Sequence, residues 1–345
     1  MTASDRLNYT AQVKLPERIV CMTEETTEWL YLLGEDWRIV GISGYTVRPP
    51  HARKEKPKVS AFTSAKIHKI LELEPDLVIG FSDMQAEIAA DLVREGVTVH
   101  ICNQRSVAEI FSTLLMIGCM VGAEQKAREL LGQYEARLNA IQQTAAALPR
   151  RPKVYFEEWG DPLISGIRWV SELIEIAGGD DSFAELSVHA DAKSRIIGDQ
   201  DRVIAKAPDI IIGSWCGRKF ATEKVVARTG WDAIPAVIHN QLFEVKSADI
   251  LQPGPACLTD GIDHLEKIIQ GWAALQVEPS AVQDKGPSAS QDQEPSAVED
   301  KEPSASQDEK PSAVQDKEPS ASQDQEPSAV QDKEPSATQK EEQKA

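Results

Sequence analysis

Short apolar runs rich in β-branched residues alternate with amphipathic helical stretches from Arg18 to Ala274, and this alternation constrains the fold most. Apolar strands separated by helices are typical of a parallel sheet that is covered on both faces. Strands are predicted at 18–23, 38–43, 76–81, 97–102, 153–159, 209–215 and 241–246. Helices are predicted at 24–34, 67–75, 84–96, 106–122, 169–179, 201–208 and 257–274, with a Pro-rich, basic loop after the second strand.

A run of strong helix formers over 123–148 interrupts this rhythm, and Pro149 and Pro152 close it. The α/β pattern then restarts. The predicted fold class is therefore α/β, with two Rossmann-like lobes on parallel sheets, a long backbone helix between them and a C-terminal repeat tail. The predicted boundaries are 17–122 for the N-terminal lobe, 123–148 for the interlobe helix, 151–274 for the C-terminal lobe and 278–345 for the tail.

The tail is a tandem octapeptide of Pro, Ser, Ala, Gln and Asp, in which a proline recurs every eight residues from Pro279 to Pro335. From Glu278 onward there is no Phe, Trp, Tyr, Leu, Ile, Met or Cys. With little apolar surface to bury, the segment cannot offset the entropy of ordering its backbone, so we predict that it is disordered. Two origins remain open, which are neutral expansion of a coding repeat and a solubilising or partner-binding arm.

Truncation after Ala274 is expected to leave the melting temperature unchanged within about a degree or two, because the tail contributes no core. Thermal unfolding of the full and truncated chains measures this. A loss of several degrees would mean that the tail docks on the lobes.

The net charge of −18 is shared between the tail, which contributes −10 from 7 Lys and 17 Asp/Glu, and the preceding residues, which contribute −8. Phosphate backbones and anionic lipids repel such a chain, so nucleic acid is not a predicted partner. No window approaches 18 apolar residues, which predicts no membrane insertion.

Two features bear on location. The sequence from Met1 to Val20 lacks the apolar core of a secretory signal, and the five cysteines are scattered without a C-x-x-C pair. Both features predict a cytoplasmic protein. The alternative is a periplasmic protein whose true start lies upstream of Met1.

Aromatic residues follow several predicted strands. Tyr45 and Phe81 do so in the first lobe, and Trp159 and Trp215 do so in the second. Ligands of open parallel sheets bind beyond the carboxyl ends of the strands. The recurrence in both lobes therefore favours a cleft for a large, flat or apolar ligand.

From about Glu17 to Trp272 the chain resembles the class III substrate-binding proteins of ABC importers, and most of all the branch that binds cobalamin and related corrinoids. Other members carry iron–siderophores or haem. The resemblance is carried by PERIVCMTEETTEWLYLLG, VGISGYTVRPPHARKEKPKVSAF, ILELEPDLVIGFSDMQAE, RVIAKAPDIIIGSW, EEWGDPLISGIRWVSELIEIAGG and ILQPGPACLTDGIDHL.

The resemblance implies particular ligand contacts. Tyr45 matches a cobalamin-contacting tyrosine, and Phe62 and Phe81 stand where cobalamin binders place tryptophan. Trp215 lies at the mouth of the second lobe, where the family also places contacts. Together with Trp159 from the strand-end argument, these residues form the predicted ligand-binding set.

The resemblance also implies an ABC permease as partner, which meets one acidic residue on each lobe. Asp201 matches the second-lobe position. The first-lobe position is His68, which does not pair with arginine, so the chain departs here from importer-bound relatives.

Catalytic alternatives have weaker support. Glu157 and Glu158 are adjacent on a strand and therefore point to opposite faces. His100 and Cys102 share a strand face, but two ligands do not make a zinc site. Cys216 has no base supplied by the sequence. We therefore predict no catalytic residue, no metal site and no catalytic cofactor.

The leading hypothesis is a non-enzymatic protein that binds a corrinoid, or a related metal chelate, between two lobes. The alternatives are an iron-siderophore or haem binding protein, and a cytoplasmic enzyme or sensor on the same fold that uses Glu157, Glu158 or Cys216.

Overall fold

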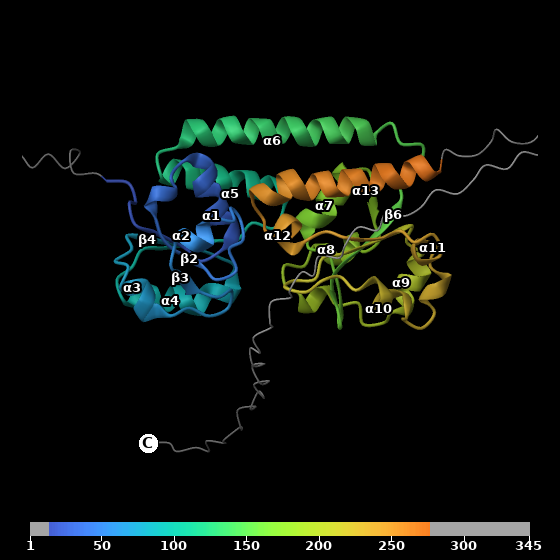
Figure 1. Ribbon diagram of the computed structural model, residues 1–345, viewed down its shortest axis with the longest axis horizontal. Coiled ribbons are helices and arrows are strands. Elements are labelled where there is room, and N and C mark those ends of the chain that lie inside the picture. Colours follow the sequence, from blue (N-terminus) through green and yellow to red (C-terminus); the bar gives the residue numbers. More distant parts are fainter. Residues whose placement is uncertain (1–13, 277–345) are drawn as a thin grey trace, which may run out of the picture. The chain divides into compact units, whose positions relative to one another are not determined.

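Each half of the chain builds one sheet, as the alternating pattern predicts (Figure 1). The computed structural model describes residues 14–276, so the predictions on the tail lie outside the described residues. The first sheet is entirely parallel, in the order β3-β2-β1-β4-β5. Its strands are β1 (Ile19–Cys21), β2 (Ile39–Ser43), β3 (Lys58–Ser60), β4 (Leu77–Phe81) and β5 (Val99–Cys102).

The helices of the first lobe follow the strands. α1 ends at Leu33 because Gly34 adopts the left-handed conformation that terminates a helix, as its position predicts. The Pro-rich segment that we expected to be a loop contains the short α2 and β3. The helices are α1 (Glu24–Leu33), α2 (Ala52–Glu55), α3 (Ile67–Leu71), α4 (Ala86–Arg94) and α5 (Val107–Met120), with 3-10 turns at Asp36–Arg38 and Asp83–Gln85.

The second sheet has the order β10-β9-β6-β7, and β8 pairs with β6 beside this path. Its main strands are parallel, but β7 runs antiparallel to β6, a hairpin that the apolar pattern does not predict. Its tight turn follows Gly160 at the end of β6. The strands are β6 (Lys153–Gly160), β7 (Leu163–Ser165), β8 (Asp180–Asp181), β9 (Ile210–Gly213) and β10 (Leu242–Glu244).

Most helices of the second lobe are short. They are α7 (Arg168–Ile176), α8 (Ala184–Ser187), α9 (Asp201–Lys206), α10 (Thr222–Val226), α11 (Pro235–Ile238), α12 (Ser247–Ile250) and α13 (Ile262–Leu275), with a π-helical turn at Cys257–Gly261 and 3-10 turns at Lys193–Arg195 and Trp231–Ala233. In the described range no helix has the length and apolar character needed to cross a membrane.

The long helix α6 (Glu124–Ala145) lies above α5 and α13 in Figure 1 and spans both lobes. Its buried side chains recur every three or four residues, so one face packs on the layer below. The buried residues are Ala127, Leu131, Tyr134, Leu138, Ile141 and Ala145.

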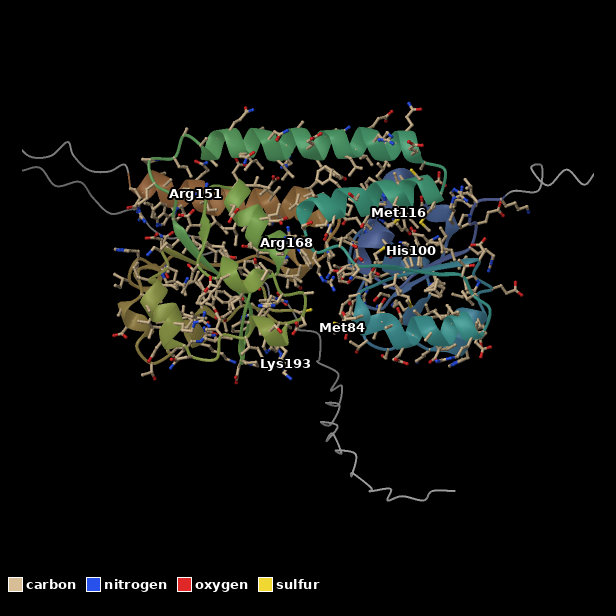
Figure 2. The ribbon with its side chains drawn as sticks, turned by 180° about the vertical axis from the view of Figure 1, so that it is seen from behind. Met84, His100, Met116, Arg151, Arg168 and Lys193 are labelled. Carbon is tan, nitrogen blue, oxygen red and sulfur yellow. The ribbon has the colours of Figure 1, made fainter. Side chains whose placement is uncertain are left out.

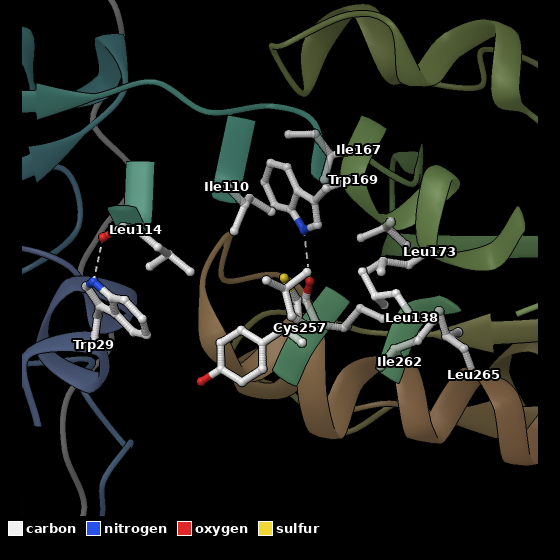
Figure 3. Packing of buried hydrophobic residues seen from close by; sticks show 14 of the residues in the cluster. Trp29, Ile110, Leu114, Leu138, Ile167, Trp169, Leu173, Cys257, Ile262 and Leu265 are labelled. Carbon is white, nitrogen blue, oxygen red and sulfur yellow. Dashed lines mark hydrogen bonds between the residues drawn. The ribbon is translucent and has the colours of Figure 1, made fainter. Parts of the chain in front are cut away.

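The main hydrophobic core is continuous from one lobe to the other beneath α6. Figure 3 shows two buried indoles that each donate a hydrogen bond to a backbone carbonyl in this core: Trp29 to Leu114 at 2.8 Å, and Trp169 to Ile250 at 2.9 Å. Both bonds satisfy a polar group that burial would otherwise leave unpaired.

Figure 2 views the molecule from behind relative to Figure 1, and it shows His100 and Met116 on the first lobe and Arg151 and Arg168 on the second. A direct hydrogen bond also joins the two lobes, because Glu172 of α7 accepts the backbone N–H of Val107 at 2.7 Å.

Candidate functional site

A cavity of about 1310 Å³ lies between the two lobes. Its first-lobe wall comes from α1 and from the segment 47–51 that follows β2. Its second-lobe wall comes from the segments that follow β9 and β10, within 215–219 and 244–249. Three of these four segments start at the carboxyl ends of strands, which is where an open parallel sheet places a ligand.

The structure places the five predicted aromatic residues in different surroundings. Trp215 lines the cavity, and the other four do not. Tyr45 is 58% exposed, and Phe62 is half-buried against the main core. Phe81 is 7% exposed, and half-buried Trp159 donates its indole N–H to the Asp161 carbonyl at 2.8 Å.

Cations cover two of these rings. The Arg105 guanidinium lies 4.6 Å from the centre of the Phe81 ring, and the Arg218 guanidinium lies 5.3 Å from that of Trp159. Because Arg218 also lines the cavity, it connects Trp159 to the cavity rim. Phe81 presents no open flat face in this conformation.

The cavity rim of the second lobe carries three cations and the exposed carboxylate of Glu244. Arg218, Lys219 and Lys246 line it, are exposed, and make no ion pair within residues 14–276. Unpaired cations at a cavity mouth attract anionic groups such as carboxylates and phosphates.

An ion-pair cluster that was not predicted from the sequence lines one part of the cavity. The Arg48 guanidinium contacts Glu28 at 2.8 Å, Asp249 at 3.2 Å and Asp260 at 2.7 Å. Glu28 also accepts the backbone N–H of Ala256 at 3.2 Å. Since Arg48 and Glu28 belong to the first lobe and their partners to the C-terminal half, the cluster joins the two lobes.

Carboxyl groups in the first turn of α1 were also missed. Burial raises the pKa of Glu24 to about 7 and that of Glu25 to about 7. Glu25 is 2% exposed, and although its Oε1 accepts the Thr23 hydroxyl at 2.7 Å, its Oε2 has no hydrogen-bond partner among residues 14–276. The only available signal was the carboxyl run E-E-T-T-E directly after a buried strand.

Glu157 and Glu158 have separate partners, as the strand alternation predicts. Glu157 is fully buried and pairs with Arg228 at 2.6 Å. Glu158 pairs with the buried Arg195, also at 2.6 Å. Both carboxylates are thus engaged in ion pairs, which leaves neither free as a general base.

The cysteines and the possible metal ligands offer little reactive chemistry. All five cysteines are free thiols. Partial burial, with the charges of Glu24 and Glu158, raises the pKa of Cys216, which opposes a thiolate nucleophile. Between residues 14 and 276, no group of three or more His, Cys, Asp or Glu side chains is placed to hold a metal. His100 and Cys102 therefore belong to no such group in this range.

Two α/β lobes on a long helix, with a large cavity at the strand ends, define a substrate-binding protein of the class III architecture. The family model described as "Periplasmic binding protein" matches residues 19–248, and the chain belongs to this family. The resemblance predicted from the sequence is thereby confirmed.

Two curated relatives are similar over most of their length. An uncharacterized ABC transporter substrate-binding lipoprotein of Bacillus subtilis is 28% identical over 286 residues, which cover 78% of this chain and 85% of the relative. A vitamin B12-binding protein of Yersinia pseudotuberculosis is 25% identical over 209 residues, which cover 59% of this chain and 72% of the relative.

Solved structures share the fold. A possible iron-binding periplasmic protein of Staphylococcus epidermidis has a TM-score of 0.65 at 22% identity, covering 74% of this chain and 99% of that one. The periplasmic vitamin B12-binding protein of Vibrio cholerae has a TM-score of 0.61 at 21% identity, covering 76% and 99%. A periplasmic heme-binding protein of a Roseiflexus species has a TM-score of 0.62 at 23% identity, covering 74% and 99%.

Proposed function

We propose that the chain is the substrate-binding protein of an ABC importer and takes a large metal chelate, a corrinoid or a related tetrapyrrole, between its lobes. The observation that carries the proposal is the interlobe cavity of about 1310 Å³ with Trp215 in its wall. The relatives are named for vitamin B12, heme and iron, which are ligands of this class or are carried in chelates. The alternative ligand is an iron-siderophore.

The proposed contacts combine apolar and anionic recognition. Trp215 offers an aromatic face, while Arg218, Lys219 and Lys246 match carboxylates or a phosphate at the edge of a macrocycle. Calorimetric titration with cyanocobalamin, cobinamide and hemin tests the proposal. If none of the three binds with a Kd below about 100 µM, which corresponds to a binding free energy of roughly −5.5 kcal/mol, the proposal is wrong.

A binding role agrees better with the site than an enzymatic one. Relatives are named as binding proteins, Glu157 and Glu158 are engaged in ion pairs, and the Cys216 thiol has a raised pKa. An enzyme or sensor on this fold is the second candidate, and it gains support only if the three titrations fail.

A permease partner belongs to the same proposal. Asp201 begins α9 and His68 lies on α3, and both are exposed. We propose Asp201 as the docking carboxylate of the second lobe, with His68 as an atypical counterpart. Relatives named as periplasmic or lipoproteins favour the periplasmic alternative for location, and fractionation of the native host decides between the two compartments.

The rim cations make the affinity depend on the charge of the ligand. We expect Lys219→Gln to weaken hemin, with its two carboxylates, by about threefold, the order of one exposed charge contact. Cobinamide, which lacks an anionic group, is the matched control and should bind both forms equally. Calorimetry at low and high salt measures this, and an equal loss for both ligands would contradict a charge contact.

A further inference from the structure

The ion pair between the fully buried Glu157 and the partly buried Arg228 contacts the Trp215 indole. Glu157 sits on β6 and is fully buried. Its two oxygens accept the Arg228 guanidinium at 2.6 and 2.9 Å. They also accept the indole N–H of Trp215 at 3.1 Å and the Tyr155 hydroxyl at 3.1 Å. One carboxylate thus gathers three donor side chains from separate parts of the second lobe.

The remaining contacts of Trp215 fix the plane of its ring. Gly160 lies against the indole so closely that a Cβ there would come within 2.6 Å of the ring. The Phe220 ring meets the indole edge-on, with 5.3 Å between ring centres. The indole is thus in contact with Glu157, Gly160 and Phe220. Trp215 is half-buried, and it also lines the cavity.

Arg228 is itself firmly held. Its guanidinium lies 4.4 Å from the centre of the fully buried Trp231 ring, and it donates to the Gly160 carbonyl at 3.3 Å. This places the guanidinium in one orientation, so the carboxylate of Glu157 is also fixed.

We infer that Glu157 and Arg228 are positioning residues, which set the orientation of the Trp215 indole and thereby the shape of the second-lobe wall. The inference rests on the proposed function for the role of that wall. Replacing an ion pair that is largely out of water by an apolar pair of similar volume is often neutral or stabilising for a fold. Its distinctive contribution here is an acceptor for the indole N–H, without which Trp215, in an irregular segment after β9, can leave its rotamer.

The test compares the effect of one double variant on ligand binding in two backgrounds, one with the Trp215 indole and one without it. E157M/R228M keeps an apolar pair of similar volume but removes the acceptor, and it is made with Trp215 and with W215F. In the Trp215 background we expect the Kd for cyanocobalamin or hemin to rise by about tenfold, the order of one lost aromatic contact. In the W215F background the same double change should raise the Kd less than about twofold, because the pair then has no indole to position.

A second readout needs no ligand. Subtracting the emission of each W215F partner isolates the fluorescence of Trp215, which should shift to longer wavelength and become more accessible to iodide in E157M/R228M. R150M/D209N is the control, since Arg150 and Asp209 form a two-bond ion pair at 2.8 and 3.0 Å in the same lobe that does not touch Trp215. It should change neither readout.

Unchanged Trp215 emission would overturn the inference, and so would an equal loss of affinity in both backgrounds. If neither cyanocobalamin nor hemin binds the wild type, the proposed function fails, while the emission still decides whether the pair positions the indole.

Discussion

Trp215→Ala is expected to weaken binding of the preferred macrocycle by at least about tenfold while the protein stays folded. A buried aromatic face contributes on the order of 1–3 kcal/mol through apolar burial and stacking, and each 1.4 kcal/mol is about tenfold in Kd. Trp215 is half-buried at the cavity wall, so its loss removes ligand contact without opening the main core. Titration with cyanocobalamin, cobinamide and hemin measures the change.

Trp272 on α13 is the matched control. Its side chain is 4% exposed in the main core and stacks with the Arg150 guanidinium at 4.4 Å. Trp272→Ala should lower the free energy of unfolding by about 3–5 kcal/mol and leave the Kd unchanged. If Trp215→Ala binds the ligand as tightly as the wild type, the ligand lies elsewhere and the assigned wall is wrong.

Local patterns were sufficient to predict the architecture. The helix formers over 123–148 and the prolines after them predicted α6, which ends at Ala145. The apolar runs predicted the central buried strands, because a strand covered on both faces must be apolar throughout. β3, β7 and the two-residue β8 were missed. β3 begins directly after Pro57 in the Pro-rich segment, β7 depends on a turn rather than on an apolar pattern, and β8 consists of two aspartates.

The candidate site was predictable only in its location. Strand ends identified the edge where Trp215 lies, but a strand end does not determine where a side chain points. Tyr45 is exposed outside the cavity lining and Phe81 lies buried under Arg105, so their contacts with a ligand stay predictions. The contact between Arg48 and Asp249 joins residues 201 positions apart, which no local pattern connects.

The free energy of unfolding should depend on pH through the buried carboxyl group of Glu25. Burial raises the pKa of Glu25 to about 7, well above the value of a carboxyl group in an unfolded chain. Between the two values the folded state binds more protons than the unfolded state. The contribution of Glu25 to the free energy of unfolding therefore falls as the pH rises from about 4.5 to about 7, and it stays low above that range.

Glu25→Gln removes this proton linkage while keeping the size of the side chain. At pH 8 the variant should be more stable than the wild type by about 1–3 kcal/mol, because the wild type then holds a buried carboxylate whose Oε2 finds no partner in the described part of the chain. Below pH 5 the two proteins should differ little. Urea unfolding at pH 5, 6, 7 and 8 measures both curves, with Glu135→Gln on the exposed face of α6 as the control. Glu24, whose pKa is likewise raised to about 7, keeps its own linkage in both proteins, so the difference between the two curves isolates Glu25. A difference that does not grow from pH 5 to pH 8 would show that the pKa of Glu25 is not raised in the fold.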